Sequence, residues 1–266
     1  MRTSILSVVC IVCLFFLSSF LPKDKVVPGF DYREMGYSQP TAFIYHVVHK
    51  TQYATWEDSA GLFCSDNVFN SAPGMTTTEW TFLAGDSTGA FWVDRSKQSR
   101  HSFTEGTATR DTFLFMHPAR ACYGELQCCP YPYFENKAEW TWDFEVGEAW
   151  NVGPLFPIKG KERFYMNYKW VEGRKAFETP MGPLSCARVD ATCRSTFGVS
   201  TATYYLHETY GLVHFSVSAL DKEFFEFSLI KKVNGRKEMS KIYHHFAYGW
   251  SAPDIRRQLE QVLGTK

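Results

Sequence analysis

The feature that most constrains the fold is a strict alternation of large apolar and mostly polar residues in the C-terminal half of the chain. Residues 164–170, 213–219 and 225–229 each place an aromatic or aliphatic side chain at every second position. Successive side chains of an extended strand point to opposite faces, so a period of two predicts one buried and one exposed face. Each of these stretches is therefore predicted to be a half-buried β-strand.

Turn-forming pairs separate these stretches. The strongest is Asn234-Gly235, because both residues tolerate the positive φ of a type I′ hairpin turn. The weaker pairs are Glu172-Gly173, Tyr210-Gly211 and Asp221-Lys222. We therefore predict a meander of about six antiparallel strands beyond residue 160, which includes strands at 204–208, 212–219, 223–230 and 241–247.

In this register the two faces of the strand at 223–230 carry different residues. Phe225 and Phe227 are expected to face the core, whereas Glu226 and Ser228 face the opposite side. A shift of one residue would exchange the two sets, so the burial of Phe227 tests the register.

The N-terminal half is less regular, but it contains four segments that can add strands to the same sheet. These segments are 76–83, 88–94, 110–116 and 138–146. Three segments without a clear period, 22–40, 51–75 and 119–136, are predicted to be loops. Two prolines within 179–183 remove backbone donors, which predicts a turn or an edge kink there.

One helix is predicted close to the C-terminus, over residues 252–264. Ser251 can cap this helix, and its apolar residues fall on one face. These residues are Ile255, Leu259, Val262 and Leu263. Residues 22–266 show no linker or internal repeat and are expected to form a single domain. Its fold class is mainly β: a curved antiparallel sheet, or a half-open barrel or sandwich, built on the C-terminal meander with one C-terminal helix.

Residues 1–21 are typical of a secretory signal peptide. One arginine, Arg2, precedes an uncharged apolar run over residues 4–21. The run is short for a membrane-spanning helix, and Ser18 and Ser19 supply small residues for cleavage. We therefore expect an exported protein, periplasmic or secreted, of a bacterial cell envelope. It would contact the membrane only through this segment, and only where the segment stays uncleaved as an anchor.

The charge balance argues against several classes of partner. Lys and Arg total 28, equal to the 28 Asp and Glu, so no net charge attracts nucleic acid, anionic lipid or an acidic substrate. The 45% apolar and 17% aromatic content is enough to fill a core. No cofactor and no metal ion is predicted. The expected partner is an apolar small molecule or another protein, and not a nucleic acid.

The cysteines predict a disulfide in one loop. Outside the signal segment the chain has Cys64, Cys122, Cys128, Cys129, Cys186 and Cys193. An oxidising compartment favours disulfides, so one is predicted to staple the loop at 119–136. Its simplest form pairs Cys122 with Cys128 or Cys129, and Cys64 is the alternative partner. A bond between Cys186 and Cys193 is excluded, because seven residues of one strand separate them by about 23 Å and place them on opposite faces.

Two short motifs match catalytic sites only in part. Ser87 lies in a G-x-S-x-G pattern, but the residues after it read as a strand, whereas a hydrolase elbow needs a helix there. His207-Glu208 begins a zinc-protease motif in which Gly211 stands where the second histidine belongs. Neither motif predicts an enzyme.

Three further groups of polar residues are also expected to be structural. His117 with Cys122, Cys128 and Cys129 could ligate zinc, but the spacing matches no zinc motif. Adjacent His244 and His245 point to opposite faces of a strand and cannot chelate one ion together. The carboxylates of Asp143 and Glu145 share a face that is solvated by default, so a glycosidase role has no further support.

The aromatic residues are the remaining signal for a function. They can line one concave face, which a curved sheet either fills as core or leaves as an apolar cavity. The simpler interpretation is that these aromatic residues form the hydrophobic core, and the functional interpretation is that they line a site for a hydrophobic ligand. The candidate ligand-binding residues are Trp140, Trp142, Phe164, Tyr168, Trp170, Phe215, Phe225 and Phe227.

Five segments carry a resemblance to a known family. They are His-Pro-Ala-Arg at 117–120, Cys-Pro-Tyr-Pro at 129–132, the tryptophan-rich stretch 140–150, Glu-Thr-Pro-Met-Gly-Pro-Leu-Ser-Cys at 178–186 and Tyr-Leu-His-Glu-Thr-Tyr-Gly-Leu-Val at 205–213. Over roughly residues 112–230 the chain resembles uncharacterised exported β-rich proteins of Bacteroidota-type bacteria. It departs from them at Ala119, where a second proline is usual, and in its extra cysteines at 122, 128 and 193. The resemblance implies export, a β architecture and a buried free thiol at Cys186, and it implies no activity.

These observations favour a non-enzymatic exported binding or scaffold domain that holds an apolar ligand or partner segment. The first alternative is an extracytoplasmic hydrolase, and the second is a component of a surface assembly or adhesion structure. An apolar cavity of several hundred Å³ without clustered His, Ser or carboxylate groups would favour the binding domain. A buried histidine within reach of Ser87 would favour the hydrolase. A large exposed apolar patch or an open sheet edge would favour the assembly component.

Overall fold

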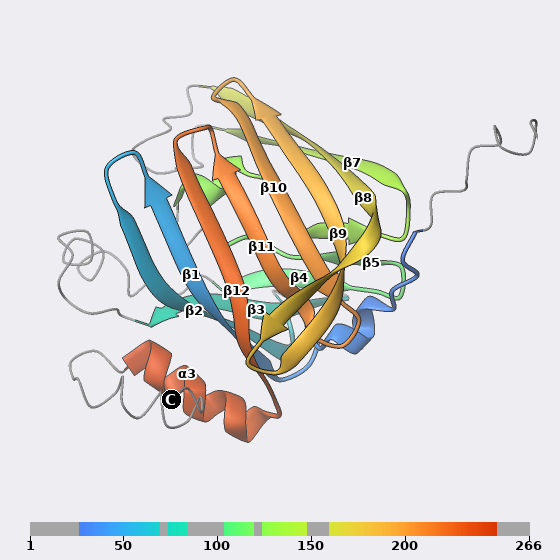
Figure 1. The fold of residues 1–266 in the computed structure, drawn as a ribbon, viewed down its shortest axis with the longest axis vertical. Coiled ribbons are helices and arrows are strands. Elements are labelled where there is room, and N and C mark those ends of the chain that lie inside the picture. The colour runs from blue at the N-terminus through green and yellow to red at the C-terminus, as the bar shows by residue number, and fades with distance from the viewer. Residues whose placement is uncertain (1–26, 70–73, 84–103, 120–123, 148–159, 249–266) are drawn as a thin grey trace, which may run out of the picture.

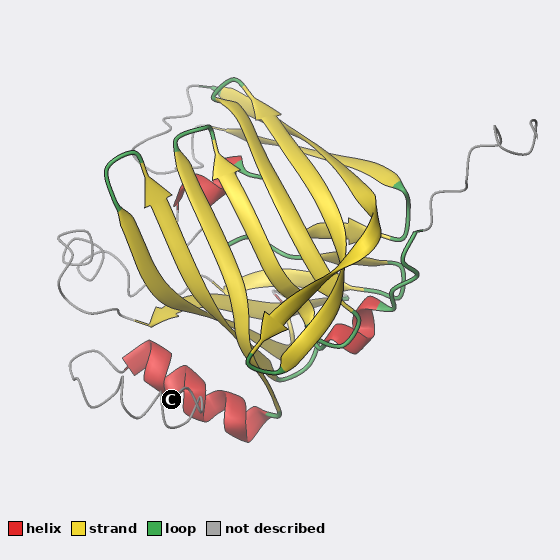
Figure 2. Cartoon of the chain, viewed as in Figure 1, coloured by secondary structure: helices red, strands yellow, loops and turns green. Residues whose placement is uncertain are grey.

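A single antiparallel sheet of twelve strands forms the body of the protein. The computed structural model describes residues 27–69, 74–83, 104–119, 124–147 and 160–248. The sheet curves on itself into a nearly closed, barrel-like wall, and one long helix lies outside it (Figures 1 and 2). The predicted fold class is confirmed.

The strand order shows how two meanders join into one wall. The strands of the first meander are β1 (Thr41–Thr51), β2 (Thr55–Val68), β3 (Met75–Leu83), β4 (Thr104–Thr109), β5 (Phe113–Phe115) and β6 (Tyr133–Glu135). Those of the second are β7 (Glu139–Gly147), β8 (Lys161–Thr179), β9 (Gly182–Ser195), β10 (Gly198–His207), β11 (Gly211–Ala219) and β12 (Glu223–Asn234). The order is β6-β5-β4-β3-β2-β1-β12-β11-β10-β9-β8-β7, so pairing of β1 with β12 joins the two meanders.

The register predicted for the second meander is confirmed. Phe225 and Phe227 are fully buried, whereas Glu226 between them is partly exposed. Phe227 lies directly opposite Phe215 of β11, and the two rings stack with centroids 4.3 Å apart. The alternation therefore identified the buried face of β12 correctly.

The strand predicted at 241–247 is wrong, because these residues belong to the helix α3 (Arg236–Tyr248). The backbone turns at Gly235, where φ is +95°, and the Met239 amide then donates to the Gly235 carbonyl, as in a helix. Asn234-Gly235 is thus a junction between strand and helix, and the described residues beyond 160 form five strands instead of about six. A short apolar run fits both the period of a strand and that of a helix, and contacts with the sheet favoured the helix here. The helix predicted at 252–264 lies outside the described residues.

Helix α3 covers the outer face of the first meander. Ile242 packs in a small cluster with Ile44 and Phe63, and the Tyr243 hydroxyl donates to Glu79 Oε1 at 2.9 Å. This contact explains why the first five residues of β1 are all buried, since its outer residues there meet α3 while its inner residues meet the core. None of the helices in the described ranges is both long and apolar enough to span a lipid bilayer.

The N-terminal half required further corrections. The loop predicted at 51–75 contains most of β2, whose inner residues Ala60, Leu62 and Cys64 are buried among polar neighbours that obscured the period. The strand predicted at 110–116 shrinks to β5, because the Arg110 amide closes a turn onto the Phe113 carbonyl. The strands predicted at 76–83 and 138–146 correspond to β3 and β7. The strand predicted at 88–94 lies outside the described residues.

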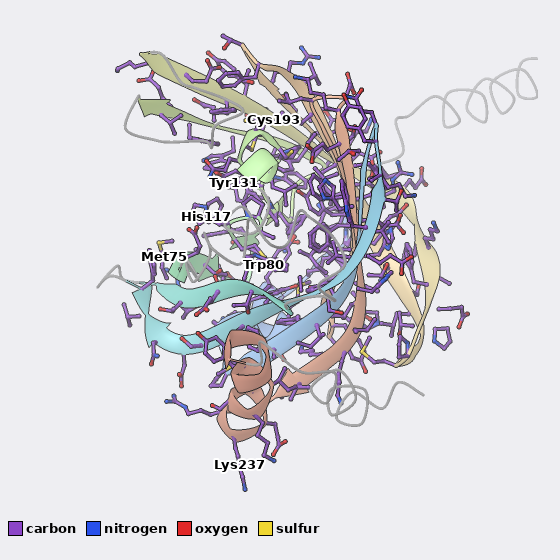
Figure 3. All side chains as sticks on the ribbon, turned by 90° about the vertical axis from the view of Figure 1, so that its left-hand side faces the viewer. Met75, Trp80, His117, Tyr131, Cys193 and Lys237 are labelled. Atoms are coloured by element: carbon purple, nitrogen blue, oxygen red, sulfur yellow. The ribbon has the colours of Figure 1, made fainter. Side chains whose placement is uncertain are left out.

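A segment of the chain fills the hollow side of the wall. Residues 126–135, which we call the inner segment, begin within the short 3-10 helix η3 (Gly124–Cys128) and end with β6. Most of their side chains are buried, and Figure 3 shows Tyr131 on the hollow side of the sheet together with Trp80.

Aromatic side chains donate hydrogen bonds to backbone carbonyl groups of the inner segment. The Tyr204 hydroxyl donates to the Pro130 carbonyl at 2.6 Å, and the Tyr168 hydroxyl donates to the Tyr131 carbonyl at 3.0 Å. Trp140 Nε1 donates to the Tyr133 carbonyl at 3.2 Å. A buried backbone needs such partners, so these rings hold the segment as well as surround it.

The β8–β9 hairpin is longer than its neighbours, and its end bends across the outside of the wall. A bulge interrupts the pairing of the two strands between Val171 and Arg174. Beyond it lie residues 174–186, which we call the arm. The arm packs on outward-facing side chains of β10 and β11, where the Phe177 ring lies 4.6 Å from that of Tyr205. Figure 1 shows the end of this hairpin crossing over β11 and β12.

Candidate functional site

The eight aromatic residues proposed to bind a ligand lie together inside the wall. Seven are buried and Trp142 is partly exposed. They pack on one another and on the inner segment: the Trp140 and Tyr168 rings stack at 5.3 Å, and Trp142 lies 5.3 Å from Tyr131. The hydrophobic core thus contains the residues that sequence reasoning selected, and their contact with a ligand stays a prediction.

The described cysteines are all buried. Cys64, Cys186 and Cys193 are free thiols, and Cys128 and Cys129 are buried within the inner segment. Burial raises the pKa of Cys186 and of Cys193 to about 12 and raises that of Cys64 further. The thiol implied for Cys186 by the family resemblance is therefore confirmed. Cys122 lies outside the described residues, so the staple of the 119–136 loop stays a prediction.

Cys186 and Cys193 lie in one strand, as expected, and both are buried. Cys186 pairs with Lys175 in the arm, whereas Cys193 pairs with Met166 in the wall, and both belong to the same hydrophobic cluster.

The partial motifs found in the sequence do not form catalytic sites in the described ranges. His207 Nδ1 accepts from the Thr209 amide at 3.1 Å within a turn. Asp143 pairs with Arg163, and Glu145 pairs with Lys161 at 2.7 Å, which lowers the pKa of Glu145. Ser87 and the side chains of His244 and His245 lie outside the described part. Among described residues, no group of three or more His, Cys, Asp or Glu could hold a metal ion.

A group of polar side chains from β3, β4 and the segment after β5 interrupts the hydrophobic core. The Thr78 and Thr107 hydroxyl groups lie 2.8 Å apart, and His117 Nε2 lies 3.5 Å from Glu105 Oε2. The His117 carbonyl accepts from Trp80 Nε1 at 3.1 Å. His117 therefore faces a carboxylate, and the side of the core made by the first meander is more polar than the other side.

The arm and the outer face of the wall enclose a groove of about 260 Å³. Phe177, Pro180 and Ile230 give it apolar walls. Val213 and Leu229 also line it, but both are buried in the hydrophobic core. Its polar lining residues are His46, Glu178, Thr179, His214 and Ser228. These residues come from β1, β8, β11 and β12 and the turn after β8, so only the folded sheet brings them together. Apolar walls with a few polar groups are the usual composition of a small-molecule site.

The floor of the groove is a row of three polar side chains. Ser228 lies between His46 of β1 and His214 of β11, each directly opposite it in the sheet. His214 Nδ1 lies 3.1 Å from the Ser228 hydroxyl. His46 Nε2 lies 3.3 Å from the Glu57 carboxylate. Cross-strand pairing therefore places three hydrogen-bonding groups in line beneath the arm.

His214 is held between the floor and the arm. The Phe177 ring stacks on its imidazole, with centroids 4.9 Å apart and planes at 22°. Burial lowers the pKa of His214, Lys175 adds to this effect, and Glu226 opposes it. The carboxylate of Glu226 is 4.0 Å from His214 Nε2, which is beyond hydrogen-bond distance. The imidazole is thus mainly neutral at pH 7 and can exchange a hydrogen bond with Ser228 or with a ligand.

Sequence reasoning missed this groove. His214 and Ser228 were assigned to the exposed face of the meander, because alternation predicts two faces but does not predict what covers them. The only available signal was the length of the β8–β9 hairpin, whose proline-containing turn was recognised as a kink. A hairpin longer than its neighbours has to extend into solvent or fold back on the sheet.

A second concavity, of about 410 Å³, lies on the outer surface near the start of β8. It is lined by Lys161, Glu162, Arg163, Tyr165, Arg194, Ser195 and Thr196. Two of its cations already pair with carboxylates of β7, and the Glu162 carboxylate accepts from the Thr196 amide at 2.8 Å. Its charges are therefore largely satisfied, which makes the groove under the arm the stronger candidate.

Comparisons with known proteins give structural likenesses of low identity. No family model matches the sequence, and no curated protein is detectably similar to it. A candidate exported protein of Bacteroides fragilis with a YmcC-like fold is 11% identical, with a TM-score of 0.41 over 78% of this chain and 100% of its own. A candidate lipoprotein of Parabacteroides distasonis is 10% identical, with a TM-score of 0.38 over 75% of this chain and 98% of its own. The hypothetical lipoprotein YmcC of Escherichia coli is 9% identical, with a TM-score of 0.33 over 83% of this chain and 95% of its own.

Proposed function

We propose that this chain is an exported, non-enzymatic binding protein that holds a small apolar molecule in the groove under the arm. Export is supported by residues 1–21, whose single arginine and uncharged apolar run are typical of a signal peptide. The inner segment already occupies the hollow side of the wall, which directs the search for a ligand to the outer face.

One observation carries the proposal: the groove combines apolar walls with a short row of hydrogen-bonding groups. Its volume, about 260 Å³, is just below the roughly 300–1,000 Å³ typical of ligand pockets, so a small molecule fits better than a folded partner. Phe177 supplies an aromatic wall, and the row of His46, Ser228 and His214 supplies polar contacts. We therefore expect a ligand with an apolar body and one uncharged polar group.

Native mass spectrometry of the chain purified from an envelope fraction tests this function. We expect a bound apolar molecule that is reduced or lost in Phe177→Ala and retained in Tyr165→Ala. Tyr165 is a matched control, because it is an aromatic residue of the same strand that is 51% exposed outside the groove. A ligand retained equally by both variants would place the site elsewhere, and a co-purified peptide would identify a partner segment as the occupant.

The Ser228–His214 pair supports the hydrolase as a second candidate. A serine hydroxyl 3.1 Å from an imidazole nitrogen has the geometry of a nucleophile and its base. Against this role, the Glu226 carboxylate is too distant to orient the imidazole by a hydrogen bond. Hydrolysis of a short-chain nitrophenyl ester that disappears in Ser228→Ala would favour the hydrolase. Equal hydrolysis rates in the unmodified chain and in Ser228→Ala would exclude the hydrolase.

A further inference from the structure

The arm rests on the wall through aromatic and charged contacts and through its buried residues Leu184 and Cys186. Phe177 packs on His214 and on Tyr205, and the Lys175 ammonium lies above both the Phe177 and Tyr205 rings, at 4.7 Å and 5.3 Å. Arg174 pairs with Glu208 at 2.7 Å near the base of the arm. The contact of Phe177 with His214 is thus the one that joins the arm to a titratable group of the groove floor.

The backbone at the base of the arm is suited to act as a hinge. Below the bulge, β8 pairs with β9 from Tyr165 to Val171, and the pairing resumes at Arg174. Glu172 and Gly173 between them have no partner in the ladder, and Gly173 has a φ of +91°. Residues that break a ladder and include a glycine can absorb the rotation of a hairpin, and a two-stranded hairpin that has left the wall is only marginally stable, so its amides lose protection.

The charges around His214 come from every element packed against it. The arm contributes Lys175, and Glu178 lines the same groove. β12 contributes Glu226, and β1 contributes His46 beyond Ser228. β10 contributes the Tyr205 ring, with its centroid 5.7 Å from that of His214. A proton on His214 would thus be attracted by one carboxylate at 4.0 Å and opposed by Lys175 and by the covering arm.

We propose that the arm is a pH-sensitive latch, which closes over the groove when His214 is neutral and opens when His214 becomes protonated. This inference deepens the proposed function, since it describes how the same groove would be opened and closed. Water stabilises a charged imidazole, and the His214 side chain, which is 17% exposed under the closed arm, gains more water when the Phe177 ring moves away from it. Opening at the hinge would therefore expose the row of polar groups on the groove floor.

The direction of the pH effect follows from burial. Burial lowers the pKa of His214 in the closed state, so the open state binds a proton more readily. The closed state is fully favoured above the ordinary histidine pKa of about 6.5. Its advantage is lost progressively as the pH falls below that value, until the closed state is itself protonated.

Amide hydrogen exchange of the arm, measured without ligand at pH 7.5 and pH 5.5 and corrected for the intrinsic rate, tests the latch. We expect several-fold less protection of residues 182–186 at pH 5.5, whereas residues 188–194 of the same strand stay protected. In His214→Gln, which keeps a hydrogen-bonding group but cannot be protonated, protection of the arm should be the same at both pH values.

Two histidine controls keep the result specific. His46→Gln and His207→Gln should retain the pH response, because neither residue stacks on Phe177. Phe177→Ala should expose the arm at both pH values. A response that persists in His214→Gln, that disappears in either control, or that is absent from the unmodified chain would overturn the latch. Because no ligand is present, failure of the latch is separate from failure of the binding function, which mass spectrometry measures independently.

Discussion

The inner and outer faces of the second meander come from alternate residues of the same strands, yet they are covered in different ways. On the inner face, aromatic rings pack on one another and on the inner segment, as in the stacked pair of Phe215 and Phe227. On the outer face, polar residues such as His214 and Ser228 lie beneath an arm whose two strands pair with each other. Stability is therefore concentrated on the inner face, and groups that can respond to ligand or pH lie on the outer face.

The largest effect should follow from a truncation on the inner face. Phe227 is fully buried, with the rings of Tyr45, Trp80 and Phe215 around it. Phe227→Ala should lower the free energy of unfolding by about 3–5 kcal/mol, because it loses burial and leaves a cavity. Chemical denaturation measures this loss. A cost below about 1 kcal/mol would contradict the packed inner face.

A smaller effect is expected where a ring holds the inner segment by one hydrogen bond. Tyr204→Phe keeps the buried ring but removes the hydroxyl that donates to the Pro130 carbonyl at 2.6 Å. The free energy of unfolding should fall by about 1–3 kcal/mol, since a buried carbonyl loses its donor. Tyr165→Phe is the control and should be neutral, because the side chain of Tyr165 is exposed. Equal changes in the two variants would show that the buried hydrogen bond has no special role.

Truncation under the arm should cost still less than the loss of Phe227. Phe177 is only partly buried, so Phe177→Ala should lower the free energy of unfolding by about 1–2 kcal/mol, below the value for a fully buried ring. Denaturation under the same conditions as for Phe227→Ala gives the comparison. A cost as large as that of Phe227→Ala would mean that the arm belongs to the core and cannot act as a latch.

Removal of an outer carboxylate should have almost no effect on stability. Glu226 lies between Phe225 and Phe227 but points to the outer face, where the His214 imidazole is 4.0 Å away. Glu226→Ala should stay within about 0.5 kcal/mol of the unmodified chain. A loss similar to that of Phe227→Ala would show that the two faces are assigned incorrectly.

The last prediction is that two buried cysteine thiols do not react with an alkylating reagent in the native protein. Burial raises the pKa of the Cys186 and Cys193 thiols to about 12, so neither should be alkylated in the native protein at pH 8. Denaturation should make both reactive, and mass spectrometry then counts the thiols. Fewer than six in the chain without its signal segment would support the predicted staple of the 119–136 loop. Six would remove it. Rapid alkylation of native Cys186 would show that the arm is open at that pH.

Local residue patterns predicted some elements well because their information is local. The alternation in β8, β11 and β12 predicted both the strands and their buried faces. The alternation failed for β2, where buried residues such as Leu62 lie among polar residues. It also failed for α3, where a short apolar run fits both the strand period and the helix period. The candidate site could not be predicted, since His214 and Ser228 look like ordinary solvated residues until a distant hairpin covers them.

The sequence by itself determined the β class, the register of the second meander, the inward direction of Phe225 and Phe227 and the signal-like character of residues 1–21. Only the tertiary structure decided that the inner segment fills the wall, that residues 241–247 are helical against β1 and β2, and that the arm encloses a groove. The physical reason is that periodicity depends on neighbours along the chain. Coverage of a face depends on contacts between distant segments, such as Phe177 on His214, which no local pattern contains.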